Sequence, residues 1–174
     1  MSAAAQRMPL AQAVDPLDAR QFRNALGQFA TGVTIVTTRS AEGVPVGLTV
    51  SSFNSVSLAP PLVLWSLAHT AASLPVFACG THFAVHVLAG DQQALAERFA
   101  ARGIDRWADL PVTAGLGGVP LLAGAAATFE CVCHSQHQAG DHTIFVGEVQ
   151  RAQQRPGVAP LLYHGGRFYT ELLL

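Results

Sequence analysis

The chain has 174 residues, of which 50% are hydrophobic and 12% are charged, against roughly 25% charged in an average soluble domain. Its net charge of −1 and its scattered lysines and arginines exclude a nucleic-acid surface, and it holds no run of the roughly 18 apolar residues that span a membrane. We expect one cytoplasmic domain whose low charge predicts an apolar subunit interface, most simply in a homodimer, with a compact alanine-rich monomer as the alternative.

The N-terminal part predicts an arm followed by a helix. Residues 1–14 show no clear periodicity and lack the pattern of a secretory signal, so we interpret them as a flexible arm before a domain over 15–174. Asp15 followed by Pro16 indicates a helix start, and we expect that helix to end near Gly32. Its apolar residues fall on one face: Leu17, Phe22, Leu26 and Phe29.

Strands and short helices follow in the next segment. The β-branched run 33–38 predicts a strand that turns near Gly43 into a second strand over 44–50. Residues 62–67 predict a strand buried on both faces, and residues 82–88 predict another. Helices are predicted over 71–78 and over 92–101, the latter capped by Asp91 and closed by Gly103.

The C-terminal part predicts further strands after an irregular connection. Residues 103–124 are rich in glycine and read as an extended connection. Residues 128–134 and 143–150 predict two strands joined across Gln138–Asp141, and a last pair surrounds Gly165 and Gly166. Without a regular alternation of strands and helices, this order predicts a mainly β fold, a closed or nearly closed antiparallel barrel with inserted helices.

A hydroxyl-rich segment from Gly43 to Pro61 is the first candidate for function. Its short hydroxyl side chains between Thr49 and Ser57, with the amides of Leu48–Ser52, form a ledge suited to a cofactor's ring edge, ribityl chain or phosphate. A polar strand end on the surface explains the same pattern. The segment alone does not choose between the two.

Other common kinds of site lack support. The chain has no Gly-x-Gly-x-x-Gly or Walker motif and no Gly-x-Ser-x-Gly elbow. His82 and His86 lie too far apart along one strand to bind one ion, so we expect no metal site among the seven histidines. Cys131 and Cys133 share a strand face, and we interpret them as small core or interface residues rather than a redox pair.

His142 is the second candidate, because it follows a turn at Gly140 and Asp141 where a strand begins. In one interpretation, its ring projects from the rim of the barrel and hydrogen-bonds a carboxamide or attracts a phosphate. In the other interpretation, the ring lies in solvent. Asp141 either favours the protonated imidazole or caps the turn.

Seven segments together resemble the flavin reductase family, the small NAD(P)H:flavin oxidoreductases that serve two-component flavin monooxygenases. The resemblance spans about residues 20–170 and keeps the family's order. The matching segments are Phe29–Thr38, Gly47–Phe53, Ser57–Leu64, Phe83–Leu88, Glu97–Ala100, Gly140–His142 and Pro160–Phe168.

The resemblance implies a homodimeric split β-barrel of the FMN-binding type, with FMN or FAD as flavin and NADH or NADPH as electron donor. It implies that His142 is the catalytic residue on the nicotinamide side, and that Tyr163–Tyr169 completes the NAD(P)H site. The cofactor-binding residues that it implies are Thr31, Gly47, Leu48, Thr49, Val50, Ser51, Ser52, Phe53, Ser66, Leu67, Ala68, Ser73, Arg98, Phe99, Asp141, His142, Tyr163 and Tyr169. Ser51, Ser52 and Ser73 are expected near the phosphate.

The chain departs from the family's pattern at two places. His69 stands where relatives often carry Arg or Lys, which puts phosphate neutralisation there in doubt, and Trp65-Ser66 replaces a smaller pair that faces the flavin.

We expect a weakly held flavin, reduced by NAD(P)H, that then leaves for a partner monooxygenase. One alternative is an enzyme like pyridoxamine-phosphate oxidase, which would need more cations around the ledge than the sequence suggests. The other is a non-catalytic flavin-binding module.

Overall fold

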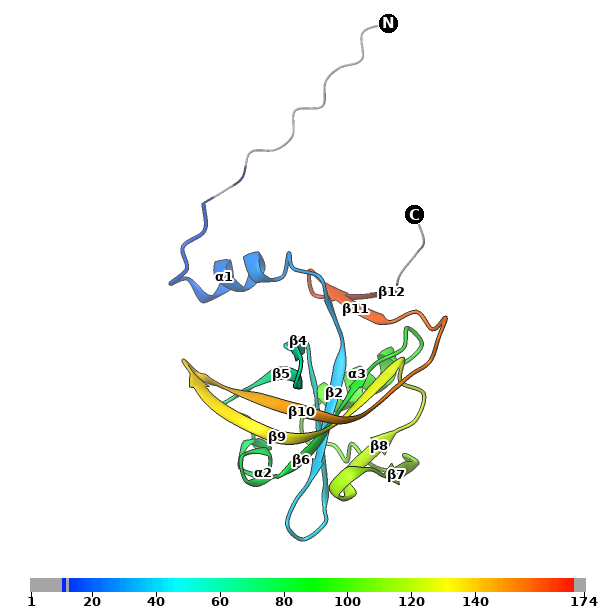
Figure 1. Cartoon of the computed structure of the whole chain (residues 1–174). Coiled ribbons are helices and arrows are strands. Elements are labelled where there is room, and N and C mark those ends of the chain that lie inside the picture. The colour runs from blue at the N-terminus through cyan, green and yellow to red at the C-terminus, as the bar shows by residue number, and fades with distance from the viewer. Residues whose placement is uncertain (1–10, 12, 171–174) are drawn as a thin grey trace, which may run out of the picture.

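A seven-stranded antiparallel sheet forms the body of the computed structural model, which describes residues 11 and 13–170 (Figure 1). The strand order is β3-β2-β6-β9-β10-β5-β4. The strands are β2 (Thr34–Arg39), β3 (Pro45–Val50), β4 (Asn54–Leu58), β5 (Pro61–Ala68), β6 (His82–Val87), β9 (Ala127–Ala139) and β10 (His142–Gln154). The predicted mainly β antiparallel class is confirmed. The sheet curls without closing, because the edge strands β3 and β4 do not pair with each other.

Two small sheets lie beside this body. One joins β1 (Thr31–Gly32), β11 (Leu161–His164) and β12 (Arg167–Thr170), and the other joins β7 (Val112–Ala114) to β8 (Pro120–Leu122) around a 3-10 turn, η1 (Leu116–Gly118). The predicted strand pair around Gly165 and Gly166 is confirmed, and both glycines have positive φ. The segment 103–124, predicted to be irregular, contains β7, η1 and β8. The predicted arm over 1–14 falls almost wholly outside the described residues.

The first and third helices begin later than their predicted caps. α1 (Ala19–Leu26) is capped by Asp18, which accepts hydrogen bonds from the amides of Arg20 and Gln21. The predicted start at Asp15 was wrong because Asp15 accepts instead from the Leu17 amide in a preceding turn, and the helix ends well before Gly32.

The cap predicted at Asp91 was also wrong. α3 (Gln93–Ala100) has Gln92 at its cap position, and the Gln92 side chain bonds the Ala89 amide and the Ala123 carbonyl. α2 (Leu74–Cys79) is shorter than the predicted helix over 71–78 and begins three residues later.

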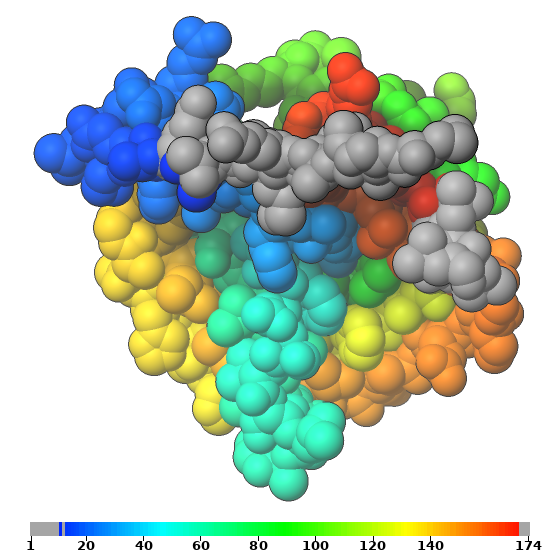
Figure 2. Space-filling view, turned by 90° about the horizontal axis from the view of Figure 1, so that it is seen from above, coloured from blue at the N-terminus to red at the C-terminus, as the bar shows by residue number. Residues whose placement is uncertain are grey.

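The apolar face of α1 is left uncovered by the residues that the structure describes. No residue of α1 is buried, and the flanking Leu17 and Phe29 are 92% and 77% exposed. On β4, Leu58 is 95% exposed. Figure 2 shows α1 in blue and the β4 region in cyan-green on the molecular surface. The free energy of burying these side chains is therefore not gained within one chain.

The core lies inside the curl of the main sheet and is centred on aromatic residues. Trp65 is fully buried, stacks on Phe145 with ring centroids 4.7 Å apart, and meets Phe77 edge-on at 4.9 Å. The Trp65 side chain points into the core. The sequence predicted that Trp65-Ser66 alters a pocket that faces the flavin, and this prediction therefore concerns Ser66 rather than Trp65. The prediction that β5 is buried on both faces was wrong, since fully buried and half-buried residues alternate along it.

The cysteines of β9 belong to this core, as the sequence predicts. Cys131 is fully buried and Cys133 packs against the same cluster. Burial raises the pKa of the Cys131 thiol to about 12, with a smaller contribution from the negative charge of Glu130. Cys131 therefore remains a neutral thiol and acts as a small apolar side chain.

A buried histidine makes the stability of the fold depend on pH. His86 bonds the Ile35 carbonyl through Nδ1 at 3.1 Å and accepts from the Leu122 amide at Nε2, also at 3.1 Å. Burial lowers its pKa from 6.5 to about 4, although the Ile35 bond opposes this shift. Between these two pH values the unfolded chain binds one more proton than the folded chain, so folding stability falls as the pH falls.

Acidification from pH 6.5 to 4 is therefore expected to cost the fold on the order of 3 kcal/mol through His86 alone. Urea unfolding across this range measures the slope. His86→Gln should be less stable at neutral pH, because it loses the two fixed hydrogen bonds, but should show a flatter dependence on pH. An unchanged slope in the variant would contradict the assignment.

Candidate cofactor site

Two hydroxyls of the predicted ledge are bonded within the protein. Thr49 Oγ1 donates to the Ala96 carbonyl at 2.7 Å and fastens β3 to α3. Ser52 Oγ accepts from the Ser66 amide at 2.9 Å and donates to the Ser66 carbonyl at 3.1 Å. Through these two bonds, the Ser52 side chain joins the ledge to the backbone of β5. Ser51 is exposed, so its hydroxyl reaches the surface of the ledge.

A cavity of about 490 Å³ opens beside the ledge. Its walls come from β3, the loop before α2, the end of α3 and the loop that follows α3. The residues that line it are Leu48, Thr49, Thr70, Ala71, Ala72, Ser73, Phe99, Ala100, Arg102, Gly103 and Arg106. No carboxylate is among them, so the lining carries two positive charges. Ser73 makes no capping bond with its side chain.

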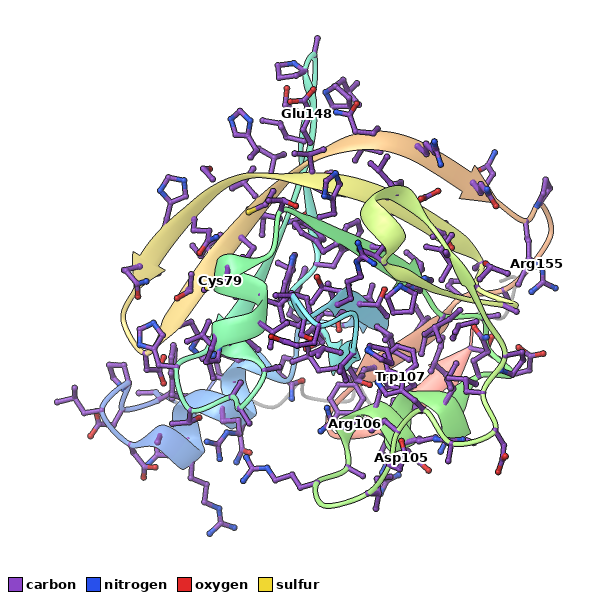
Figure 3. All side chains as sticks on the ribbon, turned by 90° about the horizontal axis from the view of Figure 1, so that it is seen from below. Cys79, Asp105, Arg106, Trp107, Glu148 and Arg155 are labelled. Atoms are coloured by element: carbon purple, nitrogen blue, oxygen red, sulfur yellow. The ribbon has the colours of Figure 1, made fainter. Side chains whose placement is uncertain are left out.

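The loop over 101–110 is held by two arginines that bind backbone carbonyls. From α3, Arg98 donates to the carbonyls of Asp105 and Ala108. From the loop itself, Arg106 donates to the Ala101 carbonyl and, at 2.8 Å, to the Gly47 carbonyl of β3. Figure 3 shows Asp105, Arg106 and Trp107 together at this end of the molecule. Arg98 thus shapes the loop and is not among the residues that line the cavity, and its cofactor-binding role stays a prediction.

Gly47 lies beneath two aromatic rings of this region. A Cβ at this position would lie 2.8 Å from Phe99 Cε1 and 3.0 Å from Trp107 Cζ2. Phe99 is fully buried and meets Trp107 edge-on at 5.0 Å. Gly47 therefore serves close packing of β3 under the loop, and its carbonyl serves Arg106. Nearby, Phe53 stacks on Phe129 at 5.6 Å, and Val50 packs against the core.

His142 lies at the same end of β5 as the cavity. β10 begins at His142, which pairs with Ala68, and the amide of His69 donates to the Asp141 carbonyl at 2.8 Å. The turn between β9 and β10 is thereby joined to the loop 69–73 that forms one wall of the cavity. Ser66 and Ala68 are half-buried along this strand, whereas Leu67 is buried in the core.

Asp141 and His142 form a close pair at this turn. His142 Nδ1 lies 2.7 Å from Asp141 Oδ1. The hydrogen bond from His142, and then its charge, hold the pKa of Asp141 below its ordinary value, with a smaller contribution from the charge of His69. Asp141 stays ionised and orients the ring, and Nε2 of His142 makes no hydrogen bond with the residues that the structure describes.

The segment Tyr163–Tyr169 does not join this arrangement within one protomer. Thr31 pairs with Tyr163 in the small sheet, and Tyr163 packs on Phe168 at 5.2 Å. Figure 1 shows β11 and β12 at the upper right, away from the β9–β10 turn at the left. The sequence interpretation placed His142 and Tyr163–Tyr169 in one nicotinamide site, and a single chain does not bring them together.

Sequence reasoning missed Arg102 and Arg106 and the loop residues Thr70–Ala72. The available signal was the pair of arginines four residues apart after the Glu97–Ala100 match. His69 was the cation considered instead, and it does not line the cavity. A separate cavity of about 390 Å³, between α2 and the turn after β2, contains none of the predicted cofactor residues.

Comparison with known protein families gives a match over most of the chain. The sequence model of a family described as the flavin reductase like domain matches residues 26–171. The chain belongs to the flavin reductase-like family. The match covers all the residues that form the main sheet, the cavity lining and the β9–β10 turn.

Similar members of the flavin reductase-like family have been characterised. An FMN reductase (NADH) of Agrobacterium fabrum is 52% identical over 151 residues, 87% of this chain and 85% of that protein. The reductase subunit of a flavin-dependent monooxygenase of Rhodococcus jostii is 40% identical over 158 residues, 91% of this chain and 80% of that protein.

A solved flavin reductase shares the fold. The NADH:FAD oxidoreductase of Streptomyces globisporus, in complex with NAD and FAD fragments, matches with a TM-score of 0.86 and 42% identity. The match covers 91% of this chain and 96% of that one.

Proposed function

We propose that this protein is an NAD(P)H:flavin oxidoreductase that reduces FMN or FAD. The observation that carries the proposal is the cavity with two arginines and no carboxylate, joined to His142 through the hydrogen bond between His69 and Asp141. The similarity to an FMN reductase and to an NADH:FAD oxidoreductase supports it.

The lining of the cavity fits the phosphate end of a flavin. Cationic guanidinium groups and the Ser73 and Thr70 hydroxyls are the donors that a phosphate requires, and Leu48, Ala71 and Phe99 supply apolar contact. The ledge Gly47–Phe53 continues from this cavity toward β5, which gives the ribityl chain and ring a path along Ser51 and Ser66.

The chain's own residues bind and orient in this proposal. Hydride transfer is the chemistry that the nicotinamide and the flavin supply when bound. The ledge holds the flavin, Asp141 fixes the ring of His142, and His142 presents Nε2 to the nicotinamide side. No proton-transfer residue is required, which agrees with the absence of a catalytic triad or carboxylate pair in the cavity lining.

Oxidation of NADH or NADPH, followed by absorbance with FMN, FAD or no flavin added, tests the function. Turnover that depends on flavin is the expected result. Flavin binding without turnover would favour the non-catalytic module, and oxidation of pyridoxamine phosphate would favour the enzyme like pyridoxamine-phosphate oxidase. Either result would contradict the proposal.

The proposed partner is a flavin-dependent monooxygenase component that receives the reduced flavin by diffusion. The similarity to the reductase subunit of a flavin-dependent monooxygenase supports this role. No helix within 13–170 is long and apolar enough to cross a bilayer. Cytoplasmic localisation, where NADH and FMN are available, belongs to the same proposal.

We further infer that the working form is a homodimer. The exposed apolar face of α1 and the exposed Leu58 support this state, because two copies gain burial that one copy lacks. Light scattering with size-exclusion chromatography is expected to return twice the mass of one chain at micromolar concentration. A monomer mass over the whole accessible concentration range would contradict the dimer.

A further inference from the structure

The loop over 101–110 presents one arginine to the cavity while another holds the loop in place. Arg106 uses Nε and both terminal nitrogens for the carbonyls of Ala101 and Gly47. Three of the five N–H donors of Arg106 are therefore used within the protein, one on each guanidinium nitrogen. Its charge adds to the field of the cavity, while most of its hydrogen-bond donors hold the loop in place.

Arg102 is differently placed. It is exposed, it lines the cavity, and within residues 13–170 it forms no hydrogen bond or ion pair with another side chain or carbonyl. The hydrogen bonds of Arg98 and Arg106 fix the loop that carries Arg102, so the backbone position of Arg102 is defined. The N–H donors of the Arg102 guanidinium are not used by the residues that the structure describes. Ser73 and Thr70, from the loop before α2, line the same cavity.

His69 does not compete for the same role. It is not part of the cavity lining, and its amide bonds the Asp141 carbonyl on the side of the β9–β10 turn. A histidine also carries a full charge only when it is protonated, whereas an arginine is charged at every physiological pH. The cation missing at position 69 is thus available from the loop that follows α3.

We propose that Arg102 is the residue that recognises the flavin phosphate and that makes the protein distinguish phosphorylated flavins from riboflavin. The inference rests on the proposed flavin-reductase function. The planar guanidinium offers two parallel donors to a phosphate, and the Ser73 hydroxyl offers a third from the loop before α2. FMN and FAD share this phosphate attached to the ribityl chain, so both are recognised by it.

Equilibrium titration of the protein with FMN, FAD and riboflavin, followed by flavin fluorescence, tests the proposal without turnover. Arg102→Gln is expected to weaken FMN and FAD binding about tenfold or more, the loss of a charge-assisted bidentate contact, while riboflavin affinity stays within about twofold. Arg39→Gln, which removes the same charge beside the separate cavity, should leave all three affinities unchanged. His69→Ala should also keep the preference of the wild type for FMN and FAD over riboflavin.

The outcomes separate this inference from the function on which it rests. A wild-type protein that binds none of the three flavins overturns the proposed function. Flavin binding by the wild type with an equal loss for all three flavins in Arg102→Gln assigns Arg102 a structural role and overturns the inference alone. If His69→Ala loses the preference for FMN and FAD over riboflavin while Arg102→Gln keeps it, the phosphate binds near His69 instead. That result likewise overturns the inference.

Discussion

Replacement of Gly47 by valine is expected to lower the free energy of unfolding by about 3 kcal/mol and to weaken flavin binding strongly. The added Cβ alone meets Phe99 Cε1 at 2.8 Å and Trp107 Cζ2 at 3.0 Å. Phe99 is fully buried and has no free space to enter, so β3 and the loop 101–110 must separate. That separation breaks the bond between Arg106 and the Gly47 carbonyl.

Chemical unfolding and flavin titration of the same variant measure both effects. Gly32→Val is the matched control, because a Cβ at Gly32 has no heavy atom within 4 Å and its φ is not in the left-handed region. It should change stability little and leave flavin affinity intact. Equal stability of the two variants would show that the packing around Gly47 is looser than the distances indicate.

Replacement of His142 by alanine is expected to reduce kcat/KM for NADH roughly ten- to hundredfold while FMN affinity remains within about twofold of the wild type. His142 lies at the start of β10, outside the cavity lining, with its ring held by Asp141 at 2.7 Å. In the proposed function, removing the ring therefore takes away a contact on the nicotinamide side, and it leaves the cavity walls in place. Stopped-flow reduction of bound flavin gives the rate, and fluorescence titration gives the affinity.

Asp141→Asn provides the companion variant. It keeps the size of the side chain but removes the charge that orients His142, so it should lower kcat/KM less than loss of the ring does. The backbone bond from His69 to the residue-141 carbonyl is unaffected by the side chain. A parallel fall in FMN affinity for His142→Ala would mean that His142 contacts the flavin instead.

Local patterns explain what the sequence predicts well. The β-branched run of β2, the strand of β6 and the Gly165–Gly166 turn depend on neighbouring residues, and the structure has them almost where they are expected. Helix starts were less predictable, because Asp15 and Asp18 are both good caps and only the bonds to Arg20 and Gln21 decide between them. β9 and β10 are longer than predicted and meet at a tight turn of Gly140 and Asp141, because their pairing continues beyond the apolar residues of each strand.

The candidate site depended more on contacts between distant residues. The hydroxyls of Thr49 and Ser52 looked available in the sequence, and their acceptors on α3 and β5 are visible only in the fold. Arg98 and Arg102 belong to one short stretch, yet one bonds the loop and the other faces the cavity. Chain order also grouped His142 with Tyr163, although the sheet topology places them in different sheets.

The two arginines that fix the loop 101–110 set which of its positions tolerate change. Arg98 and Arg106 bind main-chain carbonyls, and every amino acid supplies the same carbonyl. Side chains at Ala101 and Ala108 are therefore free to vary during evolution without loss of these bonds. Neither arginine has this freedom, because a lysine's single ammonium does not reproduce the planar fork that spans two carbonyls. The shape of the loop is thus inherited through Arg98 and Arg106, together with the packing of Trp107 on Phe99, while the residues whose carbonyls the arginines bind can change.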